Sequence, residues 1–255
     1  MTAAPPTSSR ATLGLIGFGA FGRMIAAHLR EHFDIVASDR ENIAAAARAT
    51  GVRAANITET AHAPIVVLAV PAQHLETVLA DIRPHVQPGA IVLDVCSVKL
   101  KPLALMEGLL PTHASIIGTH PLFGPQSGKD GIAGLPIALC PLRAAPEQVA
   151  CVRGFLAEKL KLRVIDTTPD AHDREMASVQ ALTHLLSRAL TELDLPETEL
   201  ATIAYQRLLA MRANLCHDSE DLFRTIQREN PYAEAARRAL RDKLDEIETR
   251  IQSSR

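Results

Sequence analysis

The stretch Gly17-Phe18-Gly19-Ala20-Phe21-Gly22 decides how the first part of this 255-residue chain folds. It follows a short apolar run, Thr12–Ile16, that is typical of a buried parallel strand, and residues 18–31 have helical character. In a motif with this spacing, the first glycine permits a tight turn, the second lets the backbone approach a ligand, and the third lets the helix pack closely on the strand. The N-terminus of such a helix offers free N–H groups and a positive dipole end to phosphates. The stretch therefore predicts a strand–turn–helix unit whose six residues bind a dinucleotide.

The same alternation of strands and helices continues along the chain. Further apolar runs predict strands at Ile35–Ser38, Pro64–Val70 and Ala90–Val95, and later ones at Ser115–Gly118, Ile137–Leu139 and Arg163–Asp166. Helical segments at Glu41–Thr50 and His74–Ile82 lie between the earlier runs. Strands and helices at this spacing form parallel βαβ units. We therefore expect an α/β fold with a Rossmann-type, doubly wound sheet.

The character of the sequence changes at Pro169. From there the chain is rich in alanine, leucine and charged residues at helical spacing, and it has no glycine after Gly154. We therefore place a domain boundary near Thr168. Residues 11–168 form the predicted dinucleotide-binding domain, and residues 169–255 form a smaller, all-helical domain that we expect to bind substrate and to dimerise.

The last predicted helix, Ala233 to Ile251, carries a narrow apolar stripe. Its members repeat at alternating steps of four and three residues, and they are Leu240, Leu244, Ile247 and Ile251. Such a stripe packs either on its own domain or on a second copy of the chain. Both interpretations remain open at this point, and we expect a homodimer.

Composition excludes several classes of function. The net charge is −2, so there is no basic excess that would indicate a nucleic-acid partner. The most apolar run, Ala63 to Ala72, is far shorter than the roughly 20 residues that cross a bilayer, and residues 1–10 lack the apolar core of a signal peptide. The cysteines show no CxxC spacing and are typical of reduced thiols. We expect a cytoplasmic protein with no membrane partner.

Asp39 and Arg40 bear on the choice of cofactor. Asp39 ends the second predicted strand, 22 residues after Gly17, where this fold places the acid that binds the ribose. A carboxylate there accepts hydrogen bonds from a ribose 2′-hydroxyl and repels a 2′-phosphate, so NAD is favoured. Arg40 could pair with the phosphate of NADP, stack on adenine, or be a solvated charge. NADP therefore remains possible.

Two further segments lie at the carboxyl ends of neighbouring predicted strands. Residues 94–99 (DVCSVK) follow the fourth strand, and residues 118–125 (GTHPLFGP) follow the next one. Ligands of open α/β sheets bind at this edge. His120 stands between a strand end and Pro121, and imidazole titrates near neutral pH, which suits a general base. A lone histidine is more often structural, but the neighbouring serine segment favours a chemical role.

These segments resemble the arogenate/prephenate dehydrogenase family, and in particular its plant-type arogenate dehydrogenases. The similarity covers DVCSVK and GTHPLFGPQSGKDGIAG at residues 94–99 and 118–134, and continues through AHD, QALTH and NLCHDSEDLF at residues 171–173, 180–184 and 214–223. It spans about residues 12–230 in the family's order and spacing.

The resemblance implies an NAD(P)-dependent oxidoreductase of tyrosine biosynthesis. Such an enzyme converts L-arogenate to L-tyrosine by hydride transfer and decarboxylation, and it needs no metal. By this resemblance, His120 accepts the proton of the ring C4 hydroxyl while hydride leaves C4, and Ser97 hydrogen-bonds the same hydroxyl and orients the histidine.

The resemblance also implies a set of substrate-binding residues. His184 matches a histidine on the substrate side, and Asp218 matches an aspartate associated with the use of arogenate. Lys99 could steer a substrate carboxylate or cofactor phosphates, or simply support the serine segment. We assign His172 a structural role. The predicted substrate contacts are Lys99, Gln126, Thr183, His184, Asn214 and Asp218.

Two positions depart from patterns known in the family. Asn214 stands where many bacterial prephenate dehydrogenases carry an arginine. Plant-type enzymes have an asparagine there, and this chain follows them. Gln126 stands where plant-type relatives usually have glutamate, which argues against a gating ion pair there.

Three other functions remain open. Prephenate, which would give 4-hydroxyphenylpyruvate, is the nearest alternative substrate. A β-hydroxyacid dehydrogenase or imine reductase shares the glycine motif, but it typically has a catalytic lysine on the first helix of the second domain, and that helix here offers His184 and no lysine. A dinucleotide-sensing module without catalysis would keep the glycines and would not need both Ser97 and His120.

Overall fold

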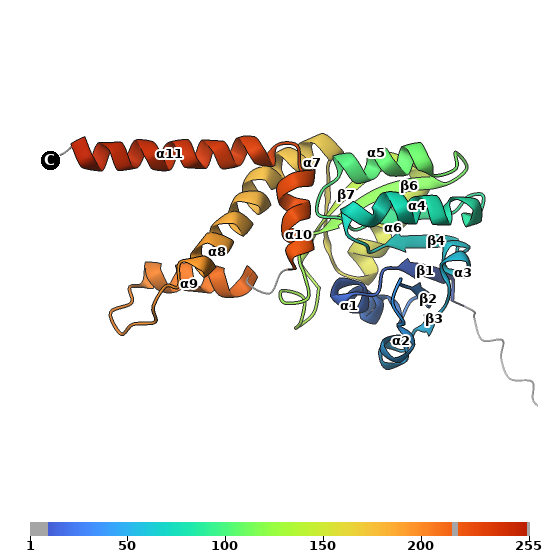
Figure 1. The fold of residues 1–255 in the computed structure, drawn as a ribbon. Helices are drawn as coiled ribbons and strands as arrows, with labels where there is room; N and C mark the ends of the chain where they lie inside the picture. Colours follow the sequence, from blue (N-terminus) through green and yellow to red (C-terminus); the bar gives the residue numbers. More distant parts are fainter. Residues whose placement is uncertain (1–9, 216–218, 254–255) are drawn as a thin grey trace, which may run out of the picture. The chain divides into compact units, whose positions relative to one another are not determined.

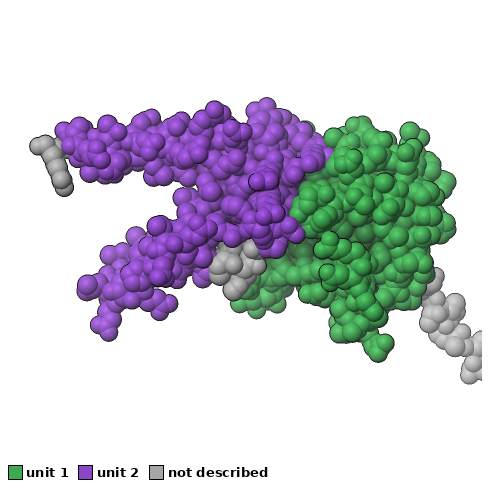
Figure 2. Space-filling model, viewed as in Figure 1, with its two compact units in different colours: residues 1–96, 102–168 green, residues 97–101, 169–255 purple. Residues whose placement is uncertain are grey.

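The computed structural model describes residues 10–215 and 219–253. These residues form two compact units (Figure 2). The first unit comprises the described residues up to Cys96 together with Pro102–Thr168, and the second comprises Ser97–Lys101 and the chain from Pro169 onward. The short segment 97–101 thus groups with the helical unit, although it lies within the residues 11–168 that we assigned to the first domain.

The first unit is built on an eight-stranded sheet in the order β3-β2-β1-β4-β5-β6-β7-β8 (Figure 1). Its strands are β1 Thr12–Ile16, β2 Asp34–Ser38, β3 Arg53–Ala54, β4 Ile65–Leu68, β5 Ile91–Asp94, β6 Ser115–Pro121, β7 Pro136–Arg143 and β8 Arg163–Asp166. The strand order reverses between β1 and β4, which is where a doubly wound sheet binds its ligand. The predicted α/β, Rossmann-type fold is confirmed.

Helices cover both faces of this sheet. They are α1 Ala20–Leu29, α2 Ala44–Thr50, α3 Ile57–Ala61, α4 Leu75–Ile82, α5 Leu100–Leu109 and α6 Pro146–Gly154, with short helical turns at η1 Ala72–His74, η2 Arg83–His85 and η3 Phe155–Lys159. Successive strand residues enter opposite cores: Val67 packs in the cluster with α1, and Val66 and Leu68 pack in the cluster with α4. Burial on both faces explains why the strands are continuous apolar runs.

One pairing in the sheet was not predicted. Strand β7 pairs with β6 in antiparallel orientation, whereas the sequence predicted parallel βαβ units for the earlier strands and left the pairing of the later ones open. The connecting residues 122–135 contain turns and no helix, and a parallel connection needs a crossover of a dozen or more residues that is usually helical. Four short elements were also not predicted from the sequence: β3, α3, α5 and α6.

The second unit is helical, as predicted. Its helices are α7 Pro169–Met176, η4 Ala177–Leu182, α8 Thr183–Glu192, α9 Ile203–Leu215, α10 Glu220–Arg224, η5 Thr225–Glu229 and α11 Ala233–Ser253. The turns η4 and η5 are π-helical. A small core of Ala181, Ile226 and Ala233 joins η4, η5 and the start of α11. No helix in the described part of the chain is long and apolar enough to span a membrane.

Apolar side chains are exposed on α11, which extends away from the rest of its unit (Figure 1). Leu244 is 54% exposed, Ile247 38% and Ile251 59%, and Leu240 is half-buried. The stripe predicted from the sequence is therefore not buried within the unit. Dimerisation through it stays a prediction.

Candidate active site

The glycine motif forms the turn between β1 and α1, and two of its glycines are required by the chain itself. Gly17 has a φ of +98°, and a Cβ there would lie 2.3 Å from the carbonyl oxygen of Ala69. A Cβ on Gly22 would lie 2.2 Å from the carbonyl oxygen of Gly17. Both positions therefore exclude larger residues by geometry.

Gly19 behaves differently, because a Cβ added there would meet no atom within 4 Å. The protein itself does not demand glycine at this position, whereas close approach of a pyrophosphate would. Gly19 is also the N-cap of α1, and no side chain caps the helix. Ala20 is exposed and Phe21 half-buried at the start of the helix. The space and the helix N-terminus suit the phosphates of a dinucleotide.

Asp39 lies against the glycine turn. Its Oδ2 accepts a hydrogen bond from the backbone N–H of Phe18 at 2.6 Å, and its Oδ1 accepts one from the N–H of Glu41 at 3.2 Å. The backbone N–H of Gly17 donates to the carbonyl of Ser38 at 2.9 Å. The carboxylate is thus held beside the loop at the carboxyl end of β2, where a ribose-binding acid belongs. Arg40, the next residue, is exposed.

Arg23 was not identified from the sequence. Its Nη1 donates to the carbonyl oxygen of Phe18 at 3.2 Å, so an exposed guanidinium sits against the glycine turn from one turn inside α1. In the sequence, the only indication of this role is that Arg23 is a basic residue in the first turn of the helix.

His120 is held at the end of β6, and only 3% of its surface is exposed. It pairs in register with Ala138 of β7. The preceding residue, Thr119, donates its hydroxyl to the carbonyl of Asp94 at 2.6 Å and so joins the ends of β6 and β5. A Cβ on Gly118 would approach Leu103 to 2.9 Å. The backbone that carries the imidazole is therefore fixed from several sides, which suits a group that acts by position.

The segment that carries Ser97 and Lys99 is anchored by a carboxylate far along the chain. Asp173 is fully buried and accepts hydrogen bonds from the backbone N–H of Lys99 at 2.8 Å and of Leu100 at 2.9 Å. Nδ1 of His172 lies 2.8 Å from the same carboxylate. Asp173 therefore caps the N-terminus of α5, where a negative charge also complements the helix dipole. From the sequence, Asp173 was noted only as part of the AHD segment and was given no role.

Lys99 itself is fully buried, and Ser97 is half-buried. Burial of Lys99 favours the interpretation in which it supports the serine segment. Contact with the substrate stays a prediction for both residues.

The other predicted substrate residues are spread over the two units. Gln126 is exposed in the loop between β6 and β7, and Thr183 and His184 are half-buried directly after η4. The Thr183 hydroxyl donates to the carbonyl of Gln180 at 3.1 Å. Asn214 lies near the end of α9, but its side chain, like all of Asp218, is outside the described residues.

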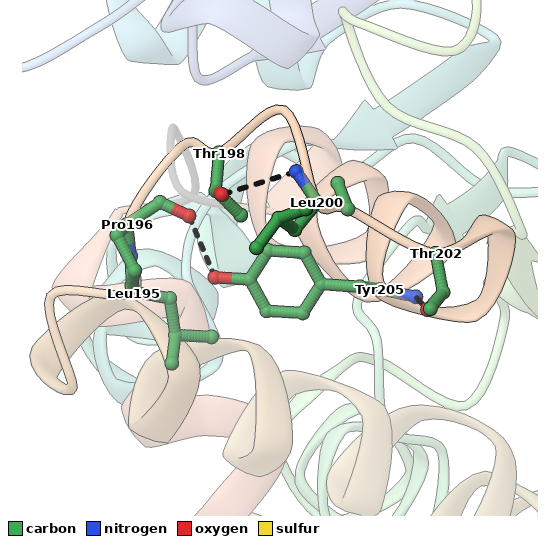
Figure 3. A pocket seen from close by; sticks show the side chains of 7 residues that line it. Leu195, Pro196, Thr198, Leu200, Thr202 and Tyr205 are labelled. Carbon is green, nitrogen blue, oxygen red and sulfur yellow. Dashed lines mark hydrogen bonds between the residues drawn. The ribbon is translucent and has the colours of Figure 1, made fainter.

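A separate hollow between α8 and α9 contains none of the predicted site residues (Figure 3). It has a volume of about 450 Å³ and is lined by Leu195, Pro196, Thr198, Leu200, Ala201, Thr202 and Tyr205. The Tyr205 hydroxyl donates to the carbonyl of Pro196 at 2.7 Å and closes this turn on itself.

Comparison with known proteins gives the family. Residues 21–166, more than half of the chain, match the family model described as prephenate dehydrogenase, nucleotide-binding domain. The chain belongs to the arogenate/prephenate dehydrogenase family. The family inferred from the sequence motifs is thus confirmed. Residues 189–255 match a second model, described as TYRAAT1-like, C-terminal domain.

Several relatives match most of this chain. Arogenate dehydrogenase 2, chloroplastic, from Arabidopsis thaliana is 30% identical over 236 residues, which are 89% of this chain and 66% of that protein. The chain spans only 37% and 41% of two further relatives. The 4-amino-4-deoxyprephenate dehydrogenase of Streptomyces pristinaespiralis is 31% identical over 244 residues, 88% of this chain and 79% of the relative.

A solved structure shows the same fold. The prephenate dehydrogenase from A. aeolicus in complex with hydroxyphenyl propionate and NAD+ superposes with a TM-score of 0.75 at 19% identity. The similarity covers 98% of this chain and 93% of the other. A Rossmann-type unit followed by helices is therefore shared between the two proteins.

Proposed function

We propose that this protein oxidatively decarboxylates L-arogenate to L-tyrosine and transfers hydride to NAD(P)+. The observation that carries the proposal is the buried His120, fixed at the carboxyl edge of the same sheet that begins with the glycine turn. Ligands bind at this edge in open α/β folds. A general base at the end of β6 in a dehydrogenase family's nucleotide-binding domain fits an alcohol oxidation.

His120 takes the central role in the proposed reaction. Bound NAD(P)+ supplies the hydride acceptor for the C4 carbon of the ring. His120 accepts the proton of the C4 hydroxyl while the C4–H bond breaks and the hydride leaves. The hydroxyl is thereby converted to a ketone. The carboxylate then leaves as CO2, its bonding electrons enter the ring, and the oxygen is reprotonated as a phenol. Because His120 is buried, water has little access to the imidazole and does not compete with the substrate hydroxyl as its proton donor.

Ser97 and His184 complete the assignment through the family motifs. Ser97 hydrogen-bonds the reacting hydroxyl and orients the histidine, and His184 with Thr183 contacts the substrate. The hydrogen bonds from Lys99 and Leu100 to Asp173 support this role for Ser97, because they immobilise the segment that carries it.

NAD is the proposed cofactor, with NADP as the alternative. Asp39 is held beside the glycine turn by two backbone N–H groups, and its negative charge would repel a 2′-phosphate. The exposed Arg40, next to Asp39 in the chain, carries a charge that would favour NADP.

Arogenate is the proposed substrate because Asp218 occupies the position associated with it. Arogenate carries an ammonium group where prephenate carries a keto oxygen, and a carboxylate attracts the ammonium through a charge-assisted hydrogen bond. The names of the relatives include both types of substrate. One is an arogenate dehydrogenase, and another is a 4-amino-4-deoxyprephenate dehydrogenase.

The substrate assignment is tested by a cofactor-reduction assay that crosses arogenate, prephenate and 4-amino-4-deoxyprephenate with NAD and NADP. We expect NADH formation with arogenate and the release of equal amounts of tyrosine and CO2. Asp218→Asn should shift the ratio of kcat/KM values toward prephenate by about 10- to 100-fold, the effect of a hydrogen bond to a charged group. An equal preference in the wild-type enzyme, or an unchanged ratio in the variant, would place selectivity elsewhere.

We also propose a homodimer that forms through the exposed stripe of α11. The cytoplasmic location stays a prediction, and the names of two plant relatives contain the word chloroplastic.

A further inference from the structure

The helical segment α7–η4–α8 is not one regular helix. Residues Ala177–Leu182 form a wide, π-helical turn. One additional residue in a turn rotates everything that follows by about 100°, the angle per residue of an α-helix. Thr183 and His184 come directly after this turn. Whatever stabilises the wide turn therefore determines which way these two side chains face.

Gln227 reaches this turn from 46 residues further along the chain. Its Nε2 donates to the carbonyl oxygen of Ala181 at 2.7 Å, and Gln227 is only 8% exposed, while Ala181 is fully buried. A wide turn disturbs the regular ladder of backbone hydrogen bonds, and a side chain that inserts into that ladder can stabilise the deviation. Removing the donor would leave a buried carbonyl with one partner fewer.

Arg237 of α11 fixes the orientation of the Gln227 amide. Its Nη1 donates to Oε1 of Gln227 at 3.0 Å and to the backbone carbonyl of the same residue at 2.7 Å. A guanidinium has donors and no acceptor, so the amide oxygen must face Arg237. The amide nitrogen is then directed to Ala181. A reversed amide would lose its bond to the Ala181 carbonyl and its side-chain bond to Arg237.

Asn230 makes a second bond of the same kind. Its Nδ2 donates to the backbone carbonyl of Asp173 at 2.8 Å, and Asn230 is 3% exposed. Two buried amides from η5 and the residue that follows it thus hold the α7–η4 segment, one before the wide turn and one within it. Both contacts are made to the backbone of the segment that leads into α8.

We propose that Gln227 is a positioning residue that holds the wide turn open and so directs Thr183 and His184 toward the substrate. The inference rests on the proposed function, which gives these two residues their place on the substrate side. It adds a residue that touches neither substrate nor cofactor and acts through the carbonyl of Ala181.

The sharpest test is Gln227→Glu, which keeps the shape of the side chain and an acceptor for Arg237. It replaces the donor that faces Ala181 by an oxygen. Gln227→Met is the second variant, because it is similar in size, lacks the donor and buries no charge. Gln206→Glu is the control, since Gln206 is exposed on α9 and the change in charge is the same.

We expect both Gln227 variants to raise KM for arogenate about tenfold, while Kd for the cofactor stays at its wild-type value. Amide hydrogen exchange across residues 181–186, measured without substrate, should be about tenfold faster than in the control. A general loss of folded structure would instead raise both KM for arogenate and Kd for the cofactor. An unchanged KM would overturn the proposal, whether or not exchange is faster.

Failure of the proposed function would look different. In that case the wild-type protein would oxidise none of the three substrates, and hydrogen exchange would decide the role of Gln227 alone. Faster exchange across the wide turn in both variants would support it, and an unchanged rate would overturn it.

Discussion

Three residues at the glycine turn could be predicted from the sequence: Gly17, Gly22 and Asp39. The two glycines were predictable from the spacing of the motif, and the structure gives the physical reason: a Cβ on Gly22 would collide with the carbonyl of Gly17, and one on Gly17 would collide with the carbonyl of Ala69, directly after β4. Asp39 was predictable because its distance from the motif is set by one βα unit. Asp173 was not, because it binds N–H groups 73 and 74 residues away, and no local pattern encodes such a contact.

Asp39→Ser tests the cofactor assignment. The variant should lose preference for NAD over NADP, because the charge that repels a 2′-phosphate is gone. It should also bind both cofactors more weakly, since the carboxylate holds the N–H groups of Phe18 and Glu41. We expect a shift of about tenfold or more in the ratio of the two Kd values, measured by titration calorimetry.

Asp34→Ser is the matched control, because Asp34 is an exposed aspartate at the other end of β2. It should leave both Kd values unchanged. A wild-type enzyme that strongly prefers NADP would mean that Arg40, and not Asp39, governs the choice.

At the scale of elements, the strands were predicted more accurately than their pairing. Buried apolar runs bounded by polar residues mark β1, β2, β4 and β5 to within a few residues. The antiparallel pairing of β7 depends on the absence of a crossover helix in residues 122–135, which strand patterns do not reveal. The π-helical turn at Ala177–Leu182 was also unpredictable, because its partner, Gln227, comes from a different helix.

The start of α7 gives a prediction on pH and stability. The hydrogen bond from Arg174, and next the one from Tyr232, hold the pKa of Asp170 below its ordinary value of 3.8. A carboxyl whose pKa is lowered on folding stabilises the folded state above its unfolded pKa, and this contribution disappears as pH falls through the folded pKa. The pairs are exposed, so the effect is small.

Asp170→Asn should therefore lower the midpoint of thermal unfolding slightly at pH 6 and leave it unchanged at a pH well below 3.8. Asp242→Asn, an exposed aspartate on α11, is the control and should show no such difference. A difference between wild type and Asp170→Asn that persists in strong acid would mean that the charge of Asp170 is not the cause.

At the scale of the whole molecule, the question is how many copies of the chain form the working enzyme. The side chains of Leu244, Ile247 and Ile251 leave an apolar stripe on α11 that its own unit does not cover. Exposed stripes of this kind mark interaction surfaces. Leu244→Lys should convert a dimer into a monomer at micromolar concentration, as measured by light scattering.

Asp242→Lys, which adds a lysine beside the stripe on the same helix, should remain dimeric. A wild-type protein that is monomeric under the same conditions would remove the proposal. The stripe would then need another partner, or it would be an exposed surface of the helix.

In the proposed reaction, the buried histidine at the end of β6 acts as the base of an oxidative decarboxylation. The most direct test of this role is the turnover of arogenate by His120→Asn, a variant of similar size that cannot accept the proton. We expect kcat to fall by about 10²- to 10⁴-fold, with little change in Kd for the cofactor, the usual effect of removing a positioned general base. Near-normal turnover, with tyrosine, CO2 and NADH still formed in equal amounts, would contradict the role of His120 as the base.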